Sequence, residues 1–226
     1  MCGRMNVTDD PRVILLMEML GMPLYPDKRY NIAPGAYAQF VIEQAGKRTL
    51  MDGMWSLLIE PKPHGDGFRP NPKWKTFNAK AERLNNSPLW KKRFARQRAI
   101  IPVSGFHEWL GKQCFQITAK DQALALAGLY ELWQFDEQFV PSFTVITLGP
   151  HLRFSAVHDK SIPLILTPKD FDAWLDPDMS NTDVFADLTQ THLAVDLQAV
   201  PIKSPDTLEP NGEPIEITAD EDAAQQ

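Results

Sequence analysis

The sequence has few of the residues from which membrane spans, disulfide frameworks and metal sites are built. Its longest apolar runs, such as residues 13–17, are far shorter than the ~18 residues that a membrane span requires. Two cysteines in 226 residues form no disulfide framework, and the five histidines show none of the CxxC or HxxxH spacings typical of metal ligands. The N-terminus also lacks a secretory pattern. The sequence therefore predicts a cytoplasmic protein with reduced thiols, no metal ion and no other cofactor.

No Gly/Ser-rich or charge-rich linker divides the middle of the chain. Hydrophobic residues make up 43% of the sequence and charged residues 23%, which is typical of a globular protein with one sizeable core. We expect a single domain over residues 1–202, followed by an acidic, disordered tail over residues 203–226. From position 206 onward the tail carries seven acidic residues and no Lys or Arg, a composition that favours disorder.

The net charge of −6 argues against a nucleic-acid partner, but the charge is distributed unevenly. Residues 73–98 contain nine basic residues and one acidic residue, a net charge of +8 that leaves −14 for the rest of the chain. Such a run forms either the solvated face of a helix or a surface that follows nucleic-acid phosphates. Composition alone does not choose between the two.

Capping signals predict three short helices. Asp10 precedes a proline and a set of apolar residues at helical spacing, and Gly21 ends the pattern, so a helix is expected over residues 10–21. Ser87-Pro88 and Thr167-Pro168 each place an N-cap residue before a proline at the first helical position, which predicts two more helices.

Strand-like segments outnumber the helices. They occupy residues 38–42, 98–103, 113–118, 123–130, 142–148 and 163–167. Because the helices do not alternate strictly with the strands, we predict an α+β fold with a mixed or antiparallel sheet rather than a doubly wound one. Residues 59–74 are rich in proline and glycine, and they predict a long irregular loop.

The N-terminus is chemically unusual because it begins Met1-Cys2-Gly3-Arg4. An initiator Met before a residue as small as Cys is normally removed, which would leave Cys2 as the first residue. A terminal Cys carries an amine with a pKa of ~7.7–8.0 and a thiol with a pKa of ~8.5 on adjacent carbons. With an aldehyde, the amine can form a Schiff base and the thiol can close onto the imine carbon to give a thiazolidine. With an amide, the thiolate can attack while the amine serves as base.

Four further segments accompany the N-terminal one. They are residues 29–35 (RYNIAPG), 78–82 (NAKAE), 105–109 (GFHEW) and 158–166 (HDK followed by PLIL). In order and spacing, the five segments resemble the SRAP family of SOS-response-associated peptidases and abasic-site processing proteins. The resemblance runs from Met1 to about Pro201. It implies a single α+β domain with a mixed, largely antiparallel, barrel-like sheet flanked by short helices.

The resemblance implies a covalent activity toward damaged DNA. Proteins of this kind bind single-stranded DNA or single/double-strand junctions, and their terminal Cys traps the aldehyde of an abasic site as a thiazolidine crosslink that shields the lesion in the SOS response. A peptidase activity that removes the initiator Met is implied as well. We expect a monomer with no membrane partner that joins the nucleoid when it binds DNA.

Carried over by position, the resemblance assigns four catalytic residues. Cys2 is the nucleophile, and Asn78 holds the amine and the sugar in place. Glu108 activates the amine and assists reversal, while His158 promotes opening of the sugar hemiacetal, since forming and dehydrating a carbinolamine requires both a base and an acid. His107 competes with His158 for the proton-transfer role, although alternation along a strand would direct His107 to the face opposite Glu108.

DNA binding would rest on phosphate contacts and stacking. The candidate DNA-binding residues are Arg4, Asn31, Pro34, Trp74, Lys80 and Lys160. The family usually has arginine at the positions of Lys80 and Lys160, and lysine cannot make the bidentate fork of arginine to a phosphate. The resemblance therefore implies the chemistry more firmly than the strength of binding.

Two other functions remain open. Class II glutaminases also begin Met-Cys-Gly and use a terminal Cys as nucleophile and base, but we find no further amide-recognition signature, and an ammonia-release assay would test this alternative. The chain could also be a noncatalytic module in which the basic segment 73–98 binds nucleic acid reversibly. In that case, replacing Cys2 would change neither binding nor products.

Overall fold

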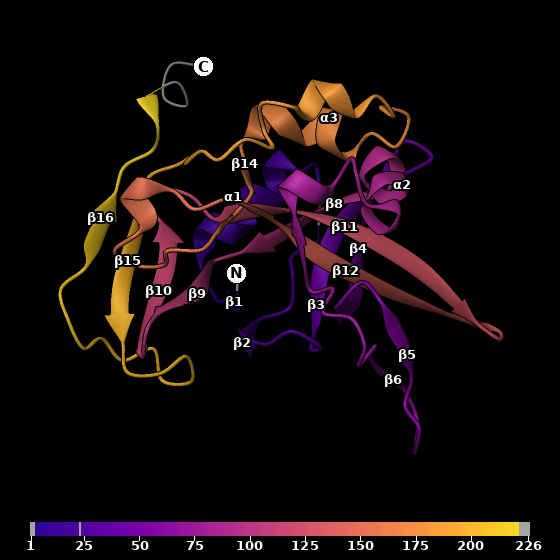
Figure 1. Cartoon of the computed structure of the whole chain (residues 1–226), viewed down its shortest axis with the longest axis horizontal. Helices are drawn as coiled ribbons and strands as arrows, with labels where there is room; N and C mark the ends of the chain where they lie inside the picture. The colour runs from indigo at the N-terminus through magenta and orange to yellow at the C-terminus, as the bar shows by residue number, and fades with distance from the viewer. Residues whose placement is uncertain (1–2, 23, 222–226) are drawn as a thin grey trace.

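The computed structural model describes residues 3–22 and 24–221, and a five-stranded barrel lies at its centre (Figure 1). The barrel strands are β3 (Tyr37–Gln44), β4 (Lys47–Trp55), β8 (Arg98–Val103), β11 (Leu124–Phe135) and β12 (Gln138–Leu148). Going round the barrel, β12 pairs with β4, β4 with β3, β3 with β8, β8 with β11, and β11 again with β12. Only the β12–β4 pair is parallel among these five. The barrel-like, largely antiparallel sheet implied by the family resemblance is therefore confirmed.

Three short strands extend the barrel strands at one end. They are β7 (Asn78–Lys80), β13 (Ile162–Pro163) and β14 (Ile165–Leu166). The first two pair with β12, β7 in parallel and β13 antiparallel, and β14 pairs with β11. The residues around position 78 and those after position 158 thus meet on the same barrel strand.

A second sheet of six strands lies beside the barrel, and all its pairs are antiparallel. In spatial order its strands are β16 (Ile215–Ile217), β15 (Leu197–Ile202), β10 (Gln113–Ala119), β9 (Gly105–Leu110), β1 (Arg4–Val7) and β2 (Arg29–Ile32). Figure 1 shows β9, β10, β15 and β16 on the side opposite the long ends of β11 and β12. The six strand segments predicted from the sequence all fall on strands of the two sheets.

A single residue, Ser104, connects barrel strand β8 to strand β9 of the second sheet. The Ser104 hydroxyl donates to the carbonyl of Asn6 (2.9 Å) and accepts from the backbone N–H of Thr8 (3.1 Å). A Cβ on the next residue, Gly105, would lie 2.6 Å from the carbonyl oxygen of Ile117. This short connection holds β9 and β1 in a fixed place beside the barrel.

Helices cover one end of the barrel (Figure 1). The α-helices of the described residues are α1 (Pro11–Met19), α2 (Pro88–Arg96) and α3 (Phe171–Leu175). Short 3-10 helices are η1 (Ala81–Arg83), η2 (Leu152–Phe154), η3 (Pro168–Asp170) and η4 (Thr182–Phe185). The buried guanidinium of Arg98 on β8 donates to the carbonyls of Phe94 (2.7 Å) and Trp174 (2.6 Å), and so ties α2 and α3 to the barrel.

The predicted helix starts are confirmed. Asp10 caps α1, because its carboxylate accepts from the backbone N–H of Arg12 at 2.9 Å. Thr167 and Asp170 form a reciprocal capping box at η3, which leads into α3. At α2, Ser87 occupies the N-cap position, but its side chain makes no capping hydrogen bond.

Two expectations about irregular segments are wrong. Residues 59–74 are not one irregular loop, because β5 (Ile59–Pro61) and β6 (Phe68–Pro70) pair there as an antiparallel hairpin. The acidic segment is ordered as far as residue 221, since β16 adds to the edge of the second sheet by pairing with β15. The remaining residues of the expected tail, 222–226, lie outside the described part of the chain.

Aromatic side chains fill the barrel. The rings of Phe40 and Phe143 lie 5.1 Å apart between centroids, and Trp55 stacks on Phe143 at 6.5 Å. The indole N–H of Trp55 donates to the carbonyl of Phe77 at 2.7 Å, so this buried polar group is satisfied.

Within the described residues, every helix is too short or too polar to span a membrane.

Barrel closure leaves no room for a side chain at Gly128. This residue pairs with Ala99 on β8 and with Val145 on β12, so β11 is flanked by two strands at this point. A Cβ on Gly128 would lie 2.5 Å from both the Ile101 Cδ1 atom and the Thr144 carbonyl oxygen.

We therefore predict that Gly128→Ala lowers the free energy of unfolding by ~3 kcal/mol, because a backbone oxygen must move. Gly46→Ala is the control, since Gly46 has a positive φ of 71° but open space around its Cβ position, and we expect a loss of ~1 kcal/mol there. Urea unfolding measures both. An equal or smaller loss in Gly128→Ala would show that the barrel yields easily at this position.

Candidate functional site

Glu108 and His158 meet although 50 residues separate them in the sequence. Glu108 lies on β9, and His158 follows η2. The Glu108 Oε2 atom is 3.4 Å from Nδ1 of His158, and Nδ1 also lies 2.9 Å from the carbonyl oxygen of Trp109. Because a carbonyl oxygen can only accept, Nδ1 carries a proton and Nε2 is the basic nitrogen of the neutral ring. Both side chains are buried, with 2% of Glu108 and 8% of His158 exposed.

Burial decides the protonation of this pair. It raises the pKa of Glu108 from its ordinary value of 4.5 to about 8, because a carboxylate is poorly solvated there. Burial also lowers the pKa of His158, since the imidazolium is disfavoured in the same way. At neutral pH the site therefore combines a protonated carboxyl group, which can donate a proton, with a neutral imidazole, which can accept one.

His107 serves a different purpose from His158. Its Nε2 atom lies 3.3 Å from the side-chain amide nitrogen of Asn6, whose Oδ1 accepts from the backbone N–H of Asn31 at 2.7 Å. The amide of Asn6 is thereby oriented so that its nitrogen donates to His107, which must stay neutral to accept. Burial, reinforced by the charge of Arg4, lowers the pKa of His107 to about 4. As alternation along β9 predicts, His107 and Glu108 contact different groups.

Strand β1 carries the N-terminal segment to this pair. Arg4 lies opposite His107 in the β1–β9 register, and the backbone N–H of Gly3 donates to the carbonyl of His107 at 3.3 Å. Cys2, the predicted nucleophile, lies outside the described residues. The described cysteine, Cys114 on β10, is buried, and burial raises the pKa of its thiol to about 11. Cys114 is therefore an unreactive thiol at neutral pH.

Lys80 and Lys160 line one cleft, together with a series of neutral polar side chains. The cleft has a volume of about 710 Å³. Its polar lining includes Asn85, Asn86, Thr147, Thr189, Gln190 and Thr191. Sequence reasoning missed these six residues, because they lie on separate loops and strands and form no local motif. The carboxylate of Glu82 also lines the cleft, so its two cations face one anion. The remaining positive charge and the neutral donors suit a polyanionic strand.

The cleft lies close in the chain to the buried pair and to Asn78. Lys160 follows His158 by two residues, which limits their Cα separation to ~7 Å. Asn78 and Lys80 stand two residues apart on β7, so both side chains project from the same face of the strand, while Ala79 between them is buried. The ammonium of Lys80 also lies 3.6 Å from a carboxylate oxygen of Glu82, an exposed pair that contributes little to stability.

The other predicted DNA contacts lie outside this cleft. Asn31 lies on β2 with a positive φ of 50°, and its side-chain amide donates to the carboxylate of Asp206. Pro34 occupies a turn, and the backbone N–H of the next residue, Gly35, donates to the carbonyl of Trp55 at 2.9 Å. Trp74 follows β6 and is 63% exposed. The described structure thus joins Asn31 to β1 through Asn6.

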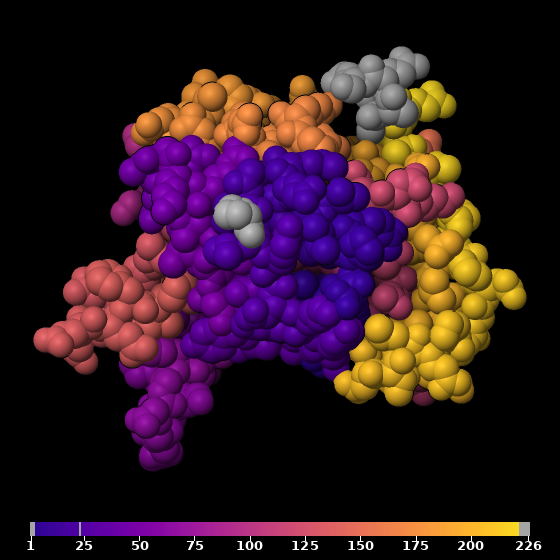
Figure 2. All heavy atoms as spheres, turned by 180° about the vertical axis from the view of Figure 1, so that it is seen from behind, coloured from indigo at the N-terminus to yellow at the C-terminus, as the bar shows by residue number. Residues whose placement is uncertain are grey.

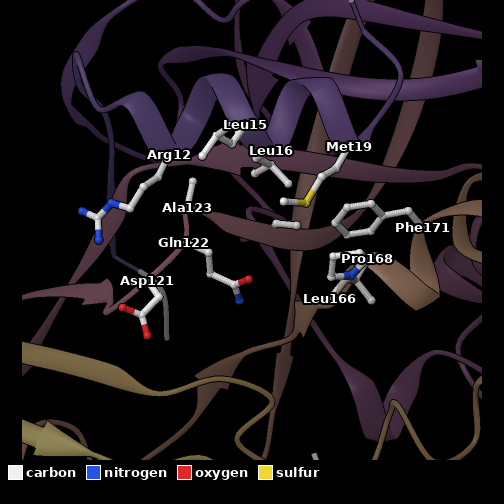
Figure 3. Close-up of a pocket in the computed structure, with 11 residues that line it drawn as sticks. Arg12, Leu15, Leu16, Met19, Asp121, Gln122, Ala123, Leu166, Pro168 and Phe171 are labelled. Carbon is white, nitrogen blue, oxygen red and sulfur yellow. The ribbon is translucent and has the colours of Figure 1, made fainter. Parts of the chain in front are cut away.

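A second pocket, between α1 and α3, is too small for a substrate. It has a volume of about 30 Å³, room for about two water molecules, and its lining is mostly apolar (Figure 3). Glu108 and His158 are not part of it. Among the described residues, no cluster of His, Cys, Asp and Glu side chains could hold a metal ion.

The raised pKa of Glu108 predicts a pH-dependent stability. The unfolded chain loses the Glu108 proton near pH 4.5 and the folded chain near pH 8, so the wild-type free energy of unfolding falls as the pH rises between these values and stays low above them. Glu108→Gln removes the titrating group. As the pH rises from about 5 to about 9, the free energy of unfolding of the variant, measured by urea unfolding, should increase relative to that of the wild type by on the order of 2–4 kcal/mol.

The matched control for this prediction is Glu137→Gln, because Glu137 is exposed at the turn between β11 and β12. This variant should follow the wild-type pH dependence. A Glu108→Gln protein that loses stability with pH in parallel with the wild type would contradict a buried, neutral carboxyl group at this position.

Comparison with known proteins gives concordant matches in sequence and fold. The abasic site processing protein YoqW of Bacillus subtilis (strain 168) is 31% identical over 182 residues, which cover 77% of this chain and 79% of that protein. The abasic site processing protein YMR114C of Saccharomyces cerevisiae is 28% identical over 156 residues, covering 66% of this chain and 40% of that protein. The solved structure of a phage-related protein from Bordetella bronchiseptica aligns with a TM-score of 0.66 and 24% identity over 93% of this chain and all of that one, a likeness of fold.

The family model described as SOS response associated peptidase (SRAP) matches residues 1–205. This range contains all five segments on which the resemblance was based. The resemblance is confirmed, and the chain belongs to the SOS response associated peptidase (SRAP) family.

Proposed function

We propose that this protein processes abasic sites in DNA by trapping the ring-opened sugar aldehyde on Cys2 as a thiazolidine. Relatives that are named abasic site processing proteins support the lesion as the target. The buried acid–base pair of Glu108 and His158 supports the chemistry, because it offers both a proton donor and a proton acceptor at neutral pH.

One observation carries the proposal: β1 runs directly beside the strand that bears Glu108. The hydrogen bond from Gly3 to the His107 carbonyl fixes the start of the described chain at that point. Cys2 is bonded to Gly3, and consecutive Cα atoms are about 3.8 Å apart. The amine and thiol of a terminal Cys2 would therefore act within one residue's length of β9.

The proposed reaction balances without an added oxidant or cofactor. The neutral amine of Cys2 adds to the aldehyde carbon, and the resulting carbinolamine loses its hydroxyl as water to give an imine. The thiolate then forms a C–S bond to the imine carbon, and the nitrogen takes up a proton. One aldehyde and one terminal Cys thus give one thiazolidine and one water molecule, and the sugar can no longer eliminate its 3′ phosphate.

The two buried side chains supply the proton transfers in this proposal. As a carboxylate, Glu108 removes the proton of the Cys2 ammonium, and as a carboxylic acid it protonates the departing hydroxyl. A pKa near 8 keeps both forms accessible at neutral pH, whereas an exposed carboxyl group would be almost wholly ionised. His158, through its basic Nε2, takes the hydroxyl proton of the closed sugar and so promotes ring opening. The amide of Asn78 would hold the sugar.

The DNA strand would follow the cleft that contains Lys80 and Lys160. Their ammonium groups, with Arg4 on β1, would pair with phosphates on either side of the reacting sugar, and the neutral side chains of the cleft would donate to further phosphate oxygens. Asn31 and Pro34 would contact the strand where it bends, and the exposed indole of Trp74 would stack on a base. Single-stranded DNA suits this arrangement, because each unpaired base exposes its face.

Removal of Met1 would be the peptidase step that exposes the reactive amine. The same groups could serve it, since Cys2 and Glu108 can act as nucleophile and base toward the preceding peptide bond. A retained Met1 would block the amine and leave the thiol without its partner.

We predict that only a chain with a free terminal Cys2 forms an adduct. An oligonucleotide with one abasic site, mixed with the wild type and denatured in SDS, should give a slowly migrating covalent band. Cys2→Ala and a variant that retains its initiator Met should give none, whereas Cys114→Ala should behave as the wild type, because the Cys114 thiol is buried. An adduct in Cys2→Ala would overturn the proposal, and ammonia release from glutamine without an adduct would favour an amidohydrolase.

We also predict a kinetic role for the buried pair. Glu108→Gln and His158→Ala should each slow adduct formation by ~100-fold or more, the usual effect of losing a general acid or base. Glu137→Gln and His64→Ala, at exposed positions, serve as controls and should leave the rate unchanged. Wild-type rates in both Glu108→Gln and His158→Ala would remove the acid–base assignment while leaving Cys2 as nucleophile.

A further inference from the structure

The acidic segment 206–221 follows the residues that the family model matches. The family model ends at residue 205, and from 206 to the C-terminus the chain has seven acidic residues and no Lys or Arg. The structure nevertheless attaches this segment to strand β15 of the second sheet at two points. Strand β16 pairs with β15, and Pro210, at the end of the loop 203–210, forms a bridge with Ile202, the last residue of β15. Such a negatively charged segment is unexpected in a protein that binds DNA.

The loop 203–210 holds its tip in a defined position. The backbone N–H of Lys203 donates to the carbonyl of Glu209 at 2.9 Å, and their side chains form an ion pair. Ile202 forms an isolated bridge with Pro210 at the base of the loop. The side-chain amide of Gln113 on β10 donates to the Ile202 carbonyl at 3.1 Å, which anchors the base.

Asp206, near the tip of this loop, accepts a hydrogen bond from the side-chain amide of Asn31 on β2. Three strands, β10, β9 and β1, separate β15 from β2 in the sheet, so the loop reaches across the part of the sheet that carries Glu108. Figure 2 shows the yellow C-terminal segment against the indigo N-terminal one, beside a hollow at the lower edge of the molecule. The acidic loop therefore lies beside a residue to which the proposed function assigns a DNA contact.

We propose that Asp206 competes with DNA for Asn31 within the same chain. A DNA phosphate must then displace the Asp206 carboxylate from the Asn31 amide before the strand can bind there. The inference rests on the proposed function, in which Asn31 contacts the strand. A carboxylate and a phosphate are both anionic acceptors for the same amide N–H group, and they repel each other at short range. The competition lowers the affinity for every strand and favours ligands that offer several phosphates at once.

An alternative role for Asp206 makes an opposite prediction. If its carboxylate merely positions the Asn31 amide for DNA, then removing the contact should weaken binding. Asp206→Asn keeps an acceptor for Asn31 but removes the charge, whereas Asp206→Ala removes both. Glu213→Gln is the matched control, because Glu213 is an exposed residue of the same segment and its replacement changes the net charge equally.

The test is fluorescence anisotropy with a labelled single strand that contains no abasic site, so that no covalent step contributes. At low salt we expect Asp206→Asn and Asp206→Ala to bind ~5-fold more tightly than the wild type, and Glu213→Gln to stay within ~2-fold of it. The difference should vanish at about 0.5 M salt, where exposed charges are screened. Equal affinities of Asp206→Asn and Glu213→Gln, or weaker binding by Asp206→Ala, would overturn the inference.

An adduct assay with an abasic oligonucleotide, run on the same proteins, separates a failure of the inference from a failure of the proposed function. If the wild type forms an adduct but the Asp206 variants bind no better than Glu213→Gln, only the competition at Asn31 is wrong. If the wild type neither binds the single strand nor forms an adduct, the proposed function and the inference both fail.

Discussion

The chemistry proposed for this protein depends on one carboxyl group that the fold keeps away from water. Glu108 lies on β9, and this strand is flanked by β10 on one side and β1 on the other, so solvent reaches the side chain poorly. An ionised carboxylate at such a place is unfavourable, and the raised pKa of the group is the result. Burying this group lowers the stability of the folded protein at neutral pH, and it also gives the carboxyl group a pKa at which it can both donate and accept a proton.

The two sheets contribute different parts of the site. The second sheet brings β1 and Glu108 together, and the barrel supplies β7 and the segment around His158 through their common neighbour β12. The chain passes between the sheets through Ser104 from β8 to β9, through residues 33–36 from β2 to β3 and through residues 120–123 from β10 to β11. These short connections leave the sheets little freedom to shift against each other. The fold therefore fixes the position of the Glu108–His158 pair relative to the polar cleft.

Local elements could be predicted from the sequence because their signals are local. Asp10 caps α1, Thr167 starts the helical segment before α3, and the strand segments carry runs of apolar residues. The β5–β6 hairpin was missed, because prolines at Pro61 and Pro70 are uncommon in strands away from sheet edges. Strand β16 was missed for another reason: its two isoleucines lie among acidic residues, and only pairing with β15 makes a strand of them.

The site itself could be predicted only in part. The family motifs indicated Glu108, His158, Lys80 and Lys160, but no periodicity predicts that residues 50 or 80 positions apart meet in space. Asn6 was missed altogether. Its amide fixes the tautomer of His107 and joins β1 to β2, a role that only the hydrogen bonds reveal.

The position of β1 has a consequence for how the chain is made. This strand pairs with β9, whose partner residues lie about 100 positions further along. At a synthesis rate of ~5–20 residues per second, β1 must wait for roughly 5–20 s before its partner has left the ribosome. During that interval β1 has no partner on the β9 side. The contact of Gly3 with the His107 carbonyl, which brings the N-terminal segment to Glu108, therefore forms only after β9 has been synthesised.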